Sequence, residues 1–188
     1  LLGKFAREFI FQIPELLKTE KNPKPTASMV TNGYLLMFGP EHAEEQYKAL
    51  ENHKACEAGT KNIKGSELTK FFPYINNDGI ETATFTDNKS EGWIDPFMFH
   101  GALKSKAMEL GAEFVKGEVK TLSEIKAKTI ISAAGCWTKE LLEDIPVEPQ
   151  KHTVFRVKCP KHIPEMPLTG DLTTGVYWRP EGKEYLAG

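Results

Sequence analysis

The stretch that decides the fold is Ile130-Ile131-Ser132-Ala133-Ala134-Gly135-Cys136-Trp137. It opens with an apolar run over 129–131, which is typical of a strand buried on both faces of a parallel sheet. Small residues follow, and 137–142 favours a helix. Small side chains let a backbone approach a ligand closely, and the first N–H groups of a helix attract an anion. The stretch therefore predicts either a dinucleotide site at the end of a buried strand or an ordinary tight strand–helix turn.

The residues before this stretch predict more of an α/β domain. Asp95-Pro96 is a helix-start signal, with Asp95 as the N-terminal cap and proline in the first helical position. We expect this helix to end at Gly111 and to be followed by a strand over 113–119. Its spacing predicts a buried face made of Phe99, Leu103, Ala107 and Leu110.

The flanking regions favour antiparallel structure. Asn32-Gly33, a dipeptide typical of type I′ turns, predicts a hairpin over 28–38. A second hairpin is expected over 82–94, beginning with a strand at 82–86, and a third region of hairpins over 153–188. Periodicity and stop signals predict additional helices over 1–20, 41–58 and 66–72.

Composition narrows the class of protein. The 188 residues are 40% hydrophobic and 27% charged with a net charge of −2, which is typical of a soluble globular chain without a clustered basic face. We therefore expect no nucleic-acid partner. No apolar run approaches the roughly 20 residues of a membrane-spanning helix. The three cysteines form no CxxC pair, which favours a reducing compartment over a disulfide scaffold.

A family resemblance rests on the order of several motifs. Glu91–Pro96, the helix that ends at Gly111, the strand at 117–119 and Ser132–Trp137 together resemble the D-amino-acid oxidase family of flavoproteins, and Asp144–Pro149 adds to the likeness. The resemblance covers nearly the whole chain. It implies a mixed α/β fold, in which a Rossmann-like FAD-binding domain is interleaved with an antiparallel substrate-domain sheet. It assigns residues 1–26 and 97–142 to the FAD domain and residues 27–96 and 143–188 to the substrate domain.

The same resemblance implies cofactor-binding residues. Val119 matches the family position whose backbone contacts the adenine end of FAD. Ala133, Ala134, Gly135 and Trp137 match the small-small-Gly-x-Trp element beside the cofactor, and we expect the pyrophosphate on this side. The resemblance thus implies FAD as the cofactor.

Substrate-binding residues are implied farther along the chain. Tyr177, Trp178 and Arg179 match the strand that forms one wall of the substrate cavity in the family. Alternation along a strand points Tyr177 and Arg179 to one face and Trp178 to the other. Arg179 is suited to anchor a substrate carboxylate with two hydrogen bonds, and the alternative is an exposed hairpin arginine. No catalytic residue is assigned, and His53 with Cys56 fits a surface helix better than a zinc site.

The activity implied by the resemblance is hydride transfer from the α-carbon of a small amine to FAD. Within the family, 91–96 and 146–149 look most like a mitochondrial member that serves the assembly of respiratory complex I. We therefore expect a mitochondrial protein on the matrix side of the inner membrane, with complex I subunits or assembly intermediates as partners. Peripheral membrane association stays open. The alternatives are a non-catalytic scaffold with the same fold, and an α/β domain whose turn binds nothing.

One departure from the family pattern concerns the cofactor. The chain has no Gly-x-Gly-x-x-Gly element, which holds the FAD pyrophosphate at the start of family members. The connections near 122–123 and 143–144 are shorter than the family pattern predicts. We therefore expect this chain to be part of a longer protein, and these residues alone to hold FAD weakly.

Overall fold

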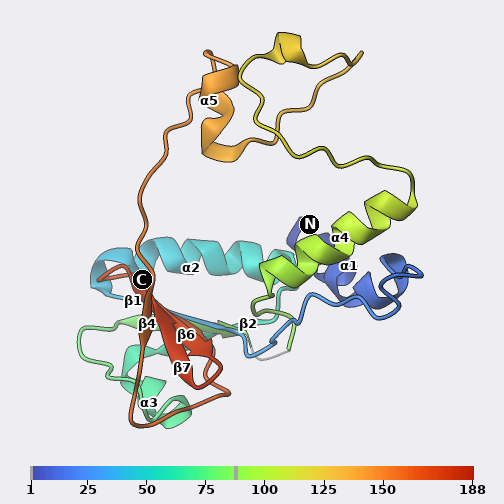
Figure 1. The fold of residues 1–188 in the computed structure, drawn as a ribbon. Coiled ribbons are helices and arrows are strands. Elements are labelled where there is room, and N and C mark those ends of the chain that lie inside the picture. Colours follow the sequence, from blue (N-terminus) through green and yellow to red (C-terminus); the bar gives the residue numbers. More distant parts are fainter. Residues whose placement is uncertain (1, 87–88) are drawn as a thin grey trace. The chain divides into compact units, whose positions relative to one another are not determined.

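The computed structural model describes residues 2–86 and 89–188. The chain divides into two compact units, which are described separately. The first unit comprises Leu1–Gly111 and Val154–Gly188, and the second unit comprises Ala112–Thr153. Every strand of the described residues belongs to the first unit (Figure 1).

The strands of the first unit form one sheet in the order β2-β3-β1-β5-β6-β7-β4. β1 pairs in parallel with β5, and the other neighbours pair antiparallel. This mostly antiparallel sheet with surrounding helices confirms the mixed α/β class. The strands are β1 (Tyr34–Phe38), β2 (Thr60–Lys64), β3 (Thr82–Thr86), β4 (Phe155–Val157), β5 (Leu168–Asp171), β6 (Val176–Glu181) and β7 (Glu184–Ala187).

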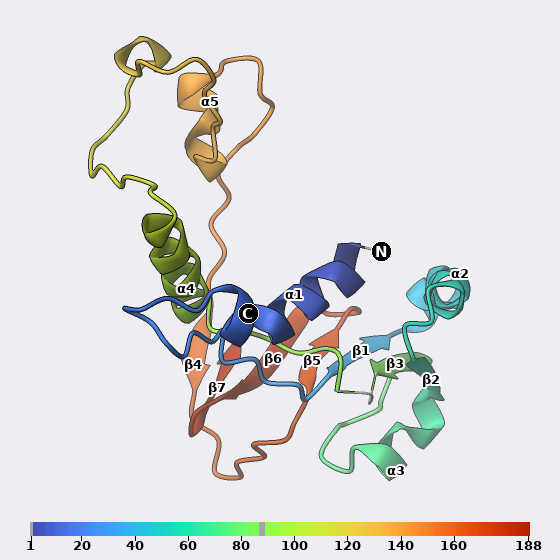
Figure 2. The ribbon, with the colours of Figure 1, turned by 90° about the vertical axis from the view of Figure 1, so that its right-hand side faces the viewer.

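The helices of the first unit are α1 (Leu2–Leu16), α2 (Pro40–Ala55), α3 (Leu68–Phe71) and α4 (Pro96–Glu109). A 3₁₀ turn, Gly65–Glu67, leads into α3. The views agree that α2 and α3 lie on opposite sides of the β1–β3–β2 end of the sheet (Figures 1 and 2). None of the described helices is long and apolar enough to cross a membrane.

Alternation along the strands separates a core face from a second face of the sheet. Leu35, Met37 and Ala83 point to the core face, where they pack with Ile63, Leu68, Phe72 and Ile75. Trp178 packs against the same cluster from β6. The threonines of β3 alternate with Ala83 along the strand, so their side chains point to the second face of the sheet. They are buried there.

A second buried cluster joins α1 to α4. Ile13, Leu17, Ala27 and Ala102 are its buried members, and the rings of Phe9 and Phe99 meet edge to face with centroids 6.4 Å apart. The predicted buried face of α4 is confirmed at Phe99, which packs in this cluster, and is wrong at Leu103 and Leu110. Leu103 is exposed, and Leu110 is 77% exposed, because α1 packs on the side of the helix that carries Ala102.

The predicted hairpin over 28–38 is wrong. Gly33 does take a left-handed φ of +81°, but the chain does not fold back on itself there. Val30 instead forms an antiparallel bridge with Trp93, and the Asn32 amide donates to the carbonyls of Pro164 and Met166 at 2.8 and 3.1 Å. Contacts distant in sequence thus decide the path of this turn.

The predicted hairpin over 82–94 is also wrong in its pairing. β3 lies between β1 and β2, so neither of its edges is left for the residues that follow. The Gly33 N–H donates to the Glu91 carbonyl at 3.1 Å, next to the Val30–Trp93 bridge. Residues 87–88 of the predicted hairpin lie outside the described residues.

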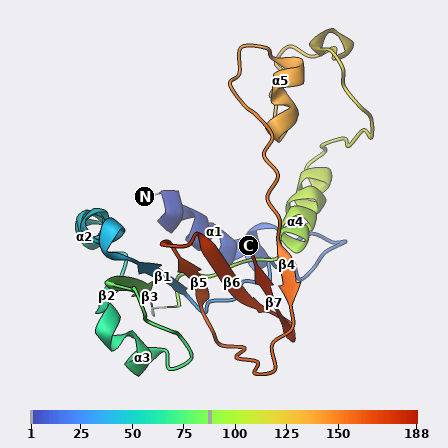
Figure 3. The same cartoon turned by 90° about the vertical axis from the view of Figure 1, so that its left-hand side faces the viewer.

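The end of the chain forms the predicted hairpin. β6 and β7 pair antiparallel, with Glu181 opposite Glu184, so the loop has two residues (Figure 3). The first of them, Gly182, has a φ of +61°, which glycine adopts without strain.

The second unit has little regular structure. Its helical parts are α5 (Thr138–Leu141), a 3₁₀ turn at Gly135–Trp137 that leads into α5, and a 3₁₀ turn at Leu122–Glu124. The helix predicted over 137–142 is confirmed, but the strands predicted over 113–119 and 129–131 are absent from this unit. A strand needs a neighbour to satisfy its backbone hydrogen bonds, and no described strand lies in this unit to provide one. The assignment of 1–26, 27–96, 97–142 and 143–188 to FAD and substrate domains stays a prediction.

Candidate functional site

The predicted cofactor residues gather around one cavity of the second unit, which we call the Trp137 cavity. It has a volume of about 470 Å³, and its lining includes Val119, Ala133, Ala134 and Trp137. The remaining predicted residue, Gly135, stands between two of these lining residues in sequence and begins the 3₁₀ turn. Four of the five residues, which are up to 18 positions apart, therefore share one cavity.

Local geometry explains the glycine in this turn. Gly135 has a φ of +58°, and a Cβ atom placed on it would meet no neighbour within 4 Å. The residue is therefore required by the backbone angle and not by crowding. The Trp137 N–H donates to the Ala134 carbonyl at 3.1 Å and closes the turn.

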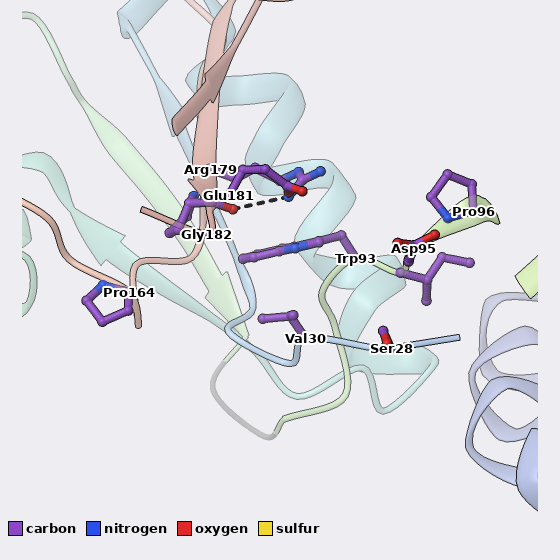
Figure 4. A pocket seen from close by; sticks show the side chains of 11 residues that line it. Ser28, Val30, Trp93, Asp95, Pro96, Pro164, Arg179, Glu181 and Gly182 are labelled. Carbon is purple, nitrogen blue, oxygen red and sulfur yellow. Dashed lines mark hydrogen bonds and ion pairs between the residues drawn. The ribbon is translucent and has the colours of Figure 1, made fainter. Parts of the chain in front are cut away.

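The predicted substrate residue Arg179 lines a cavity of the first unit, which we call the Arg179 cavity. Its volume is about 320 Å³. Three segments form it: residues 28–30, residues 93–96 and the β6–β7 hairpin with Pro164 (Figure 4). The Val30–Trp93 bridge holds the first two segments together.

Arg179 is held on several sides in this cavity. Its guanidinium lies 5.1 Å from the centre of the Trp93 ring, within the range of a cation–π contact. It also donates to the Pro180 carbonyl at 3.1 Å and to the Glu181 carboxylate. The Arg179 side chain is only 18% exposed, so it is not the exposed hairpin arginine that the sequence left as an alternative.

Tyr177 and Trp178 lie as alternation predicts. Trp178 packs on the core face of the sheet, and Tyr177 shares the opposite face with Arg179. Tyr177 is 38% exposed and is not among the residues that line the Arg179 cavity. The two predicted substrate residues thus share a face of β6, but only Arg179 borders the cavity.

Tyr34 joins the electrostatics of this region. Burial raises its pKa above the ordinary value, the negative charge of Glu91 raises the pKa further, and the positive charge of Arg179 acts in the opposite direction. Tyr34 thus lies within electrostatic reach of the guanidinium. It is a further polar group near the Arg179 cavity that the sequence did not single out.

The chain matches the family described as "FAD dependent oxidoreductase" (DAO) over residues 2–188. It belongs to that family. FAD is accordingly the cofactor of this family, as the resemblance implied.

Named relatives of this DAO-family chain share about a quarter of its residues. "FAD-dependent oxidoreductase domain-containing protein 1" of Bos taurus is 26% identical over 96% of the chain and 47% of that protein. The Xenopus laevis protein of the same name is 27% identical over the whole chain and again 47% of the relative. The chain therefore spans about half the length of the curated relatives it matches.

Solved structures show the same fold. L-proline dehydrogenase from P. horikoshii superposes with a TM-score of 0.76 at 20% identity, covering 99% of this chain and 54% of that one. Glycine oxidase from Geobacillus kaustophilus gives a TM-score of 0.70 at 16% identity, covering 99% and 53%. The DAO-type fold that the sequence predicted is confirmed.

The Trp137 cavity fits one end of FAD better than the other. Its walls are mainly apolar, its volume lies in the usual range for small-ligand pockets, and the buried Ser132 hydroxyl that lines it has no hydrogen-bond partner in the protein. Its charged lining residues are Glu118 and Glu140, and no lysine or arginine lines it. Such walls suit the uncharged adenine end, where Val119 is expected. The pyrophosphate beside Gly135 stays a prediction.

Sequence reasoning missed several residues of the Arg179 cavity. Trp93 and Asp95 belong to the motif 91–96 that carried the family resemblance, yet their place in a cavity with Arg179 depends on the Val30–Trp93 bridge. Glu181 could have been predicted, because position i+2 on a strand faces the same side as Arg179.

Among the described residues, no group of three or more potential ligand side chains could hold a metal ion.

Proposed function

We propose that the protein is an FAD-dependent oxidoreductase that oxidises a small amine bound in the Arg179 cavity. The single observation that carries the proposal is this cavity, where a largely buried Arg179 is fixed by Trp93 and Glu181. Bound FAD supplies a two-electron acceptor for the hydride of the amine α-carbon, and the resulting imine is hydrolysed by water.

In this proposal the residues of the chain bind and orient. The Arg179 cavity places charged groups and the flat Trp93 ring beside one another, which supports binding of a small charged molecule with an apolar part. The Trp137 cavity supports binding of the adenine end through its apolar walls and the unpaired Ser132 hydroxyl.

The test uses the purified full-length protein. We expect a visible flavin absorbance band that bleaches anaerobically with at least one amine from a panel of sarcosine, dimethylglycine, D-amino acids and amines without a carboxylate, such as pyrrolidine. Arg179→Met should slow bleaching and leave the flavin band in place. Lys183→Met in the neighbouring turn should change neither the rate of bleaching nor the flavin band. A protein that purifies without flavin would contradict the proposal.

A second candidate is a scaffold that assists the assembly of respiratory complex I on the matrix side of the inner mitochondrial membrane. The observation that favours it is the likeness of 91–96 and 146–149 to a mitochondrial family member. Complex I subunits or assembly intermediates would then be the partners. Co-purification of these subunits with the tagged protein from mitochondria tests this candidate. It gains support if flavin is bound but no amine of the panel bleaches it.

A further inference from the structure

The Arg179 cavity carries a charge pattern that bears on the kind of amine it accepts. Its charged lining residues are Asp95, Arg179 and Glu181 (Figure 4). Glu181 balances the positive charge of Arg179, so the carboxylate of Asp95 leaves the lining with one net negative charge.

Strand geometry keeps Glu181 next to Arg179. The two residues stand at i and i+2 on β6 and therefore point to the same face of the sheet. The guanidinium already donates to the Glu181 carboxylate and the Pro180 carbonyl, and it lies over the Trp93 ring. A carboxylate is thus bound to Arg179 within the chain itself.

A substrate carboxylate would have to compete with this internal partner. It would either displace Glu181 or share the guanidinium with it, and in both cases it would lie close to a like charge. A substrate ammonium group meets the opposite situation, since both Asp95 and Glu181 attract it. One Asp95 oxygen accepts from the Met98 N–H at 2.9 Å, which leaves the other oxygen available to a ligand.

The remaining walls suit an apolar group. Val30, Trp93, Pro96 and Pro164 line the cavity beside the charged residues. We propose that the Arg179 cavity selects amines that carry an apolar group and no carboxylate, and that Glu181 is the residue that determines this specificity. The inference rests on the proposed function for the role of this cavity as the substrate site.

The test compares L-proline with pyrrolidine, two cyclic amines that differ only in the carboxylate. Calorimetry on the flavin-loaded full-length protein gives both dissociation constants. We expect pyrrolidine to bind about tenfold more tightly than L-proline or better. Tighter binding of L-proline, or no binding of either amine, would overturn the inference, and this comparison needs no variant.

The role of Glu181 is tested with Glu181→Gln, which frees the guanidinium at nearly constant shape. We expect this variant to lower the preference for pyrrolidine about tenfold. Glu184→Gln is the matched control, because Glu184 forms the same kind of ion pair with Arg156 on the same sheet but does not line the cavity. Equal preferences in both variants would overturn the assignment.

The two proposals fail in different ways. If no amine bleaches the flavin but the calorimetric preference changes as expected in Glu181→Gln, amine oxidation is wrong and the selectivity of the cavity stands. If the flavin is bleached faster by amines with a carboxylate than by their decarboxylated counterparts, the proposed oxidation stands and the selectivity is wrong.

Discussion

A single backbone angle at Gly135 links the sequence motif to the cofactor prediction. Its φ of +58° strains residues that have a side chain, and a β-branched residue most of all. Gly135→Val should therefore distort the turn beside the Trp137 cavity, at a cost of about 1–3 kcal/mol. We expect the full-length variant to lose FAD during gel filtration, measured as the ratio of flavin to protein absorbance.

Gly79→Val is the control for this substitution. Gly79 has a φ of +76° and, like Gly135, has no atom within 4 Å of a Cβ placed on it, but it belongs to the first unit. It should lower stability to a similar degree and leave the flavin ratio unchanged. Equal flavin ratios in the two variants would contradict the placement of the cofactor beside Gly135.

Tyr74 gives a prediction about pH. Burial, and secondarily the neighbouring Tyr185, raise the pKa of Tyr74 from its ordinary value of 10.0 to about 12. The unfolded chain therefore releases this proton at a lower pH than the folded protein does, so unfolding becomes easier as the pH rises from 10 to 12. Urea unfolding across this range should show a fall in stability that is smaller in Tyr74→Phe. A fall of the same size in both proteins would refute the assignment.

At the residue scale, part of the site could also be predicted from the sequence. The family resemblance implied four cofactor residues that line one cavity: Val119, Ala133, Ala134 and Trp137. Tyr34 was missed for a physical reason. It interacts with the charge of Arg179 across a folded sheet, which no local pattern records.

At the scale of elements, local signals predicted what local interactions stabilise. The Asp95 cap, the short helix after Gly65 and the hairpin loop at Gly182 all depend on neighbours within a few residues, and all are present. The hairpin predicted at Asn32-Gly33 is wrong because partners more than 60 residues away in sequence hold Val30 and Asn32.

β2 was not predicted, and β5 lies in the region predicted to form hairpins although no strand was placed at 168–171. The composition of the two strands explains why. β2 is mostly polar and buries only Ile63, so it lacks the apolar alternation of a strand with one buried face. β5 contains a glycine and an aspartate, both poor strand formers, and it is stabilised by lying between β1 and β6. Long-range pairing outweighs local propensity in both strands.

The first turn of α4 gives the prediction for an element. The Asp95 side chain accepts a hydrogen bond from the Met98 N–H at 2.9 Å, which satisfies one of the otherwise unpaired donors of the helix. Asp95→Ala should lower the free energy of unfolding by about 1 kcal/mol, whereas Asp95→Ser should retain most of it. Thermal and urea unfolding of the two variants measure the difference. Equal losses would show that charge, and not capping, is what Asp95 contributes.

At the scale of the whole molecule, the two units differ in what stabilises them. The first unit contains the whole described sheet and both clusters of buried hydrophobic residues. Between 112 and 153 no described residue is buried, and Val115 and Ile131 are 89% and 87% exposed. Burial of apolar surface is the main source of stability, so the second unit lacks within itself the interactions that resist unfolding.

This contrast predicts a pattern of amide hydrogen exchange in the 188-residue chain. Amides of β1, β3, β5 and β6 lie in the interior of the sheet and should exchange slowly, because their exchange requires opening of the core. Amides of Ala112–Thr153 should exchange within the shortest measured times, since few of them have backbone partners and none is covered by a core. Mass spectrometry of peptic peptides separates the two sets. Slow exchange across 113–119 and 129–131 would instead mean that these segments pair as strands, as their sequences predict, and would contradict this contrast between the two units.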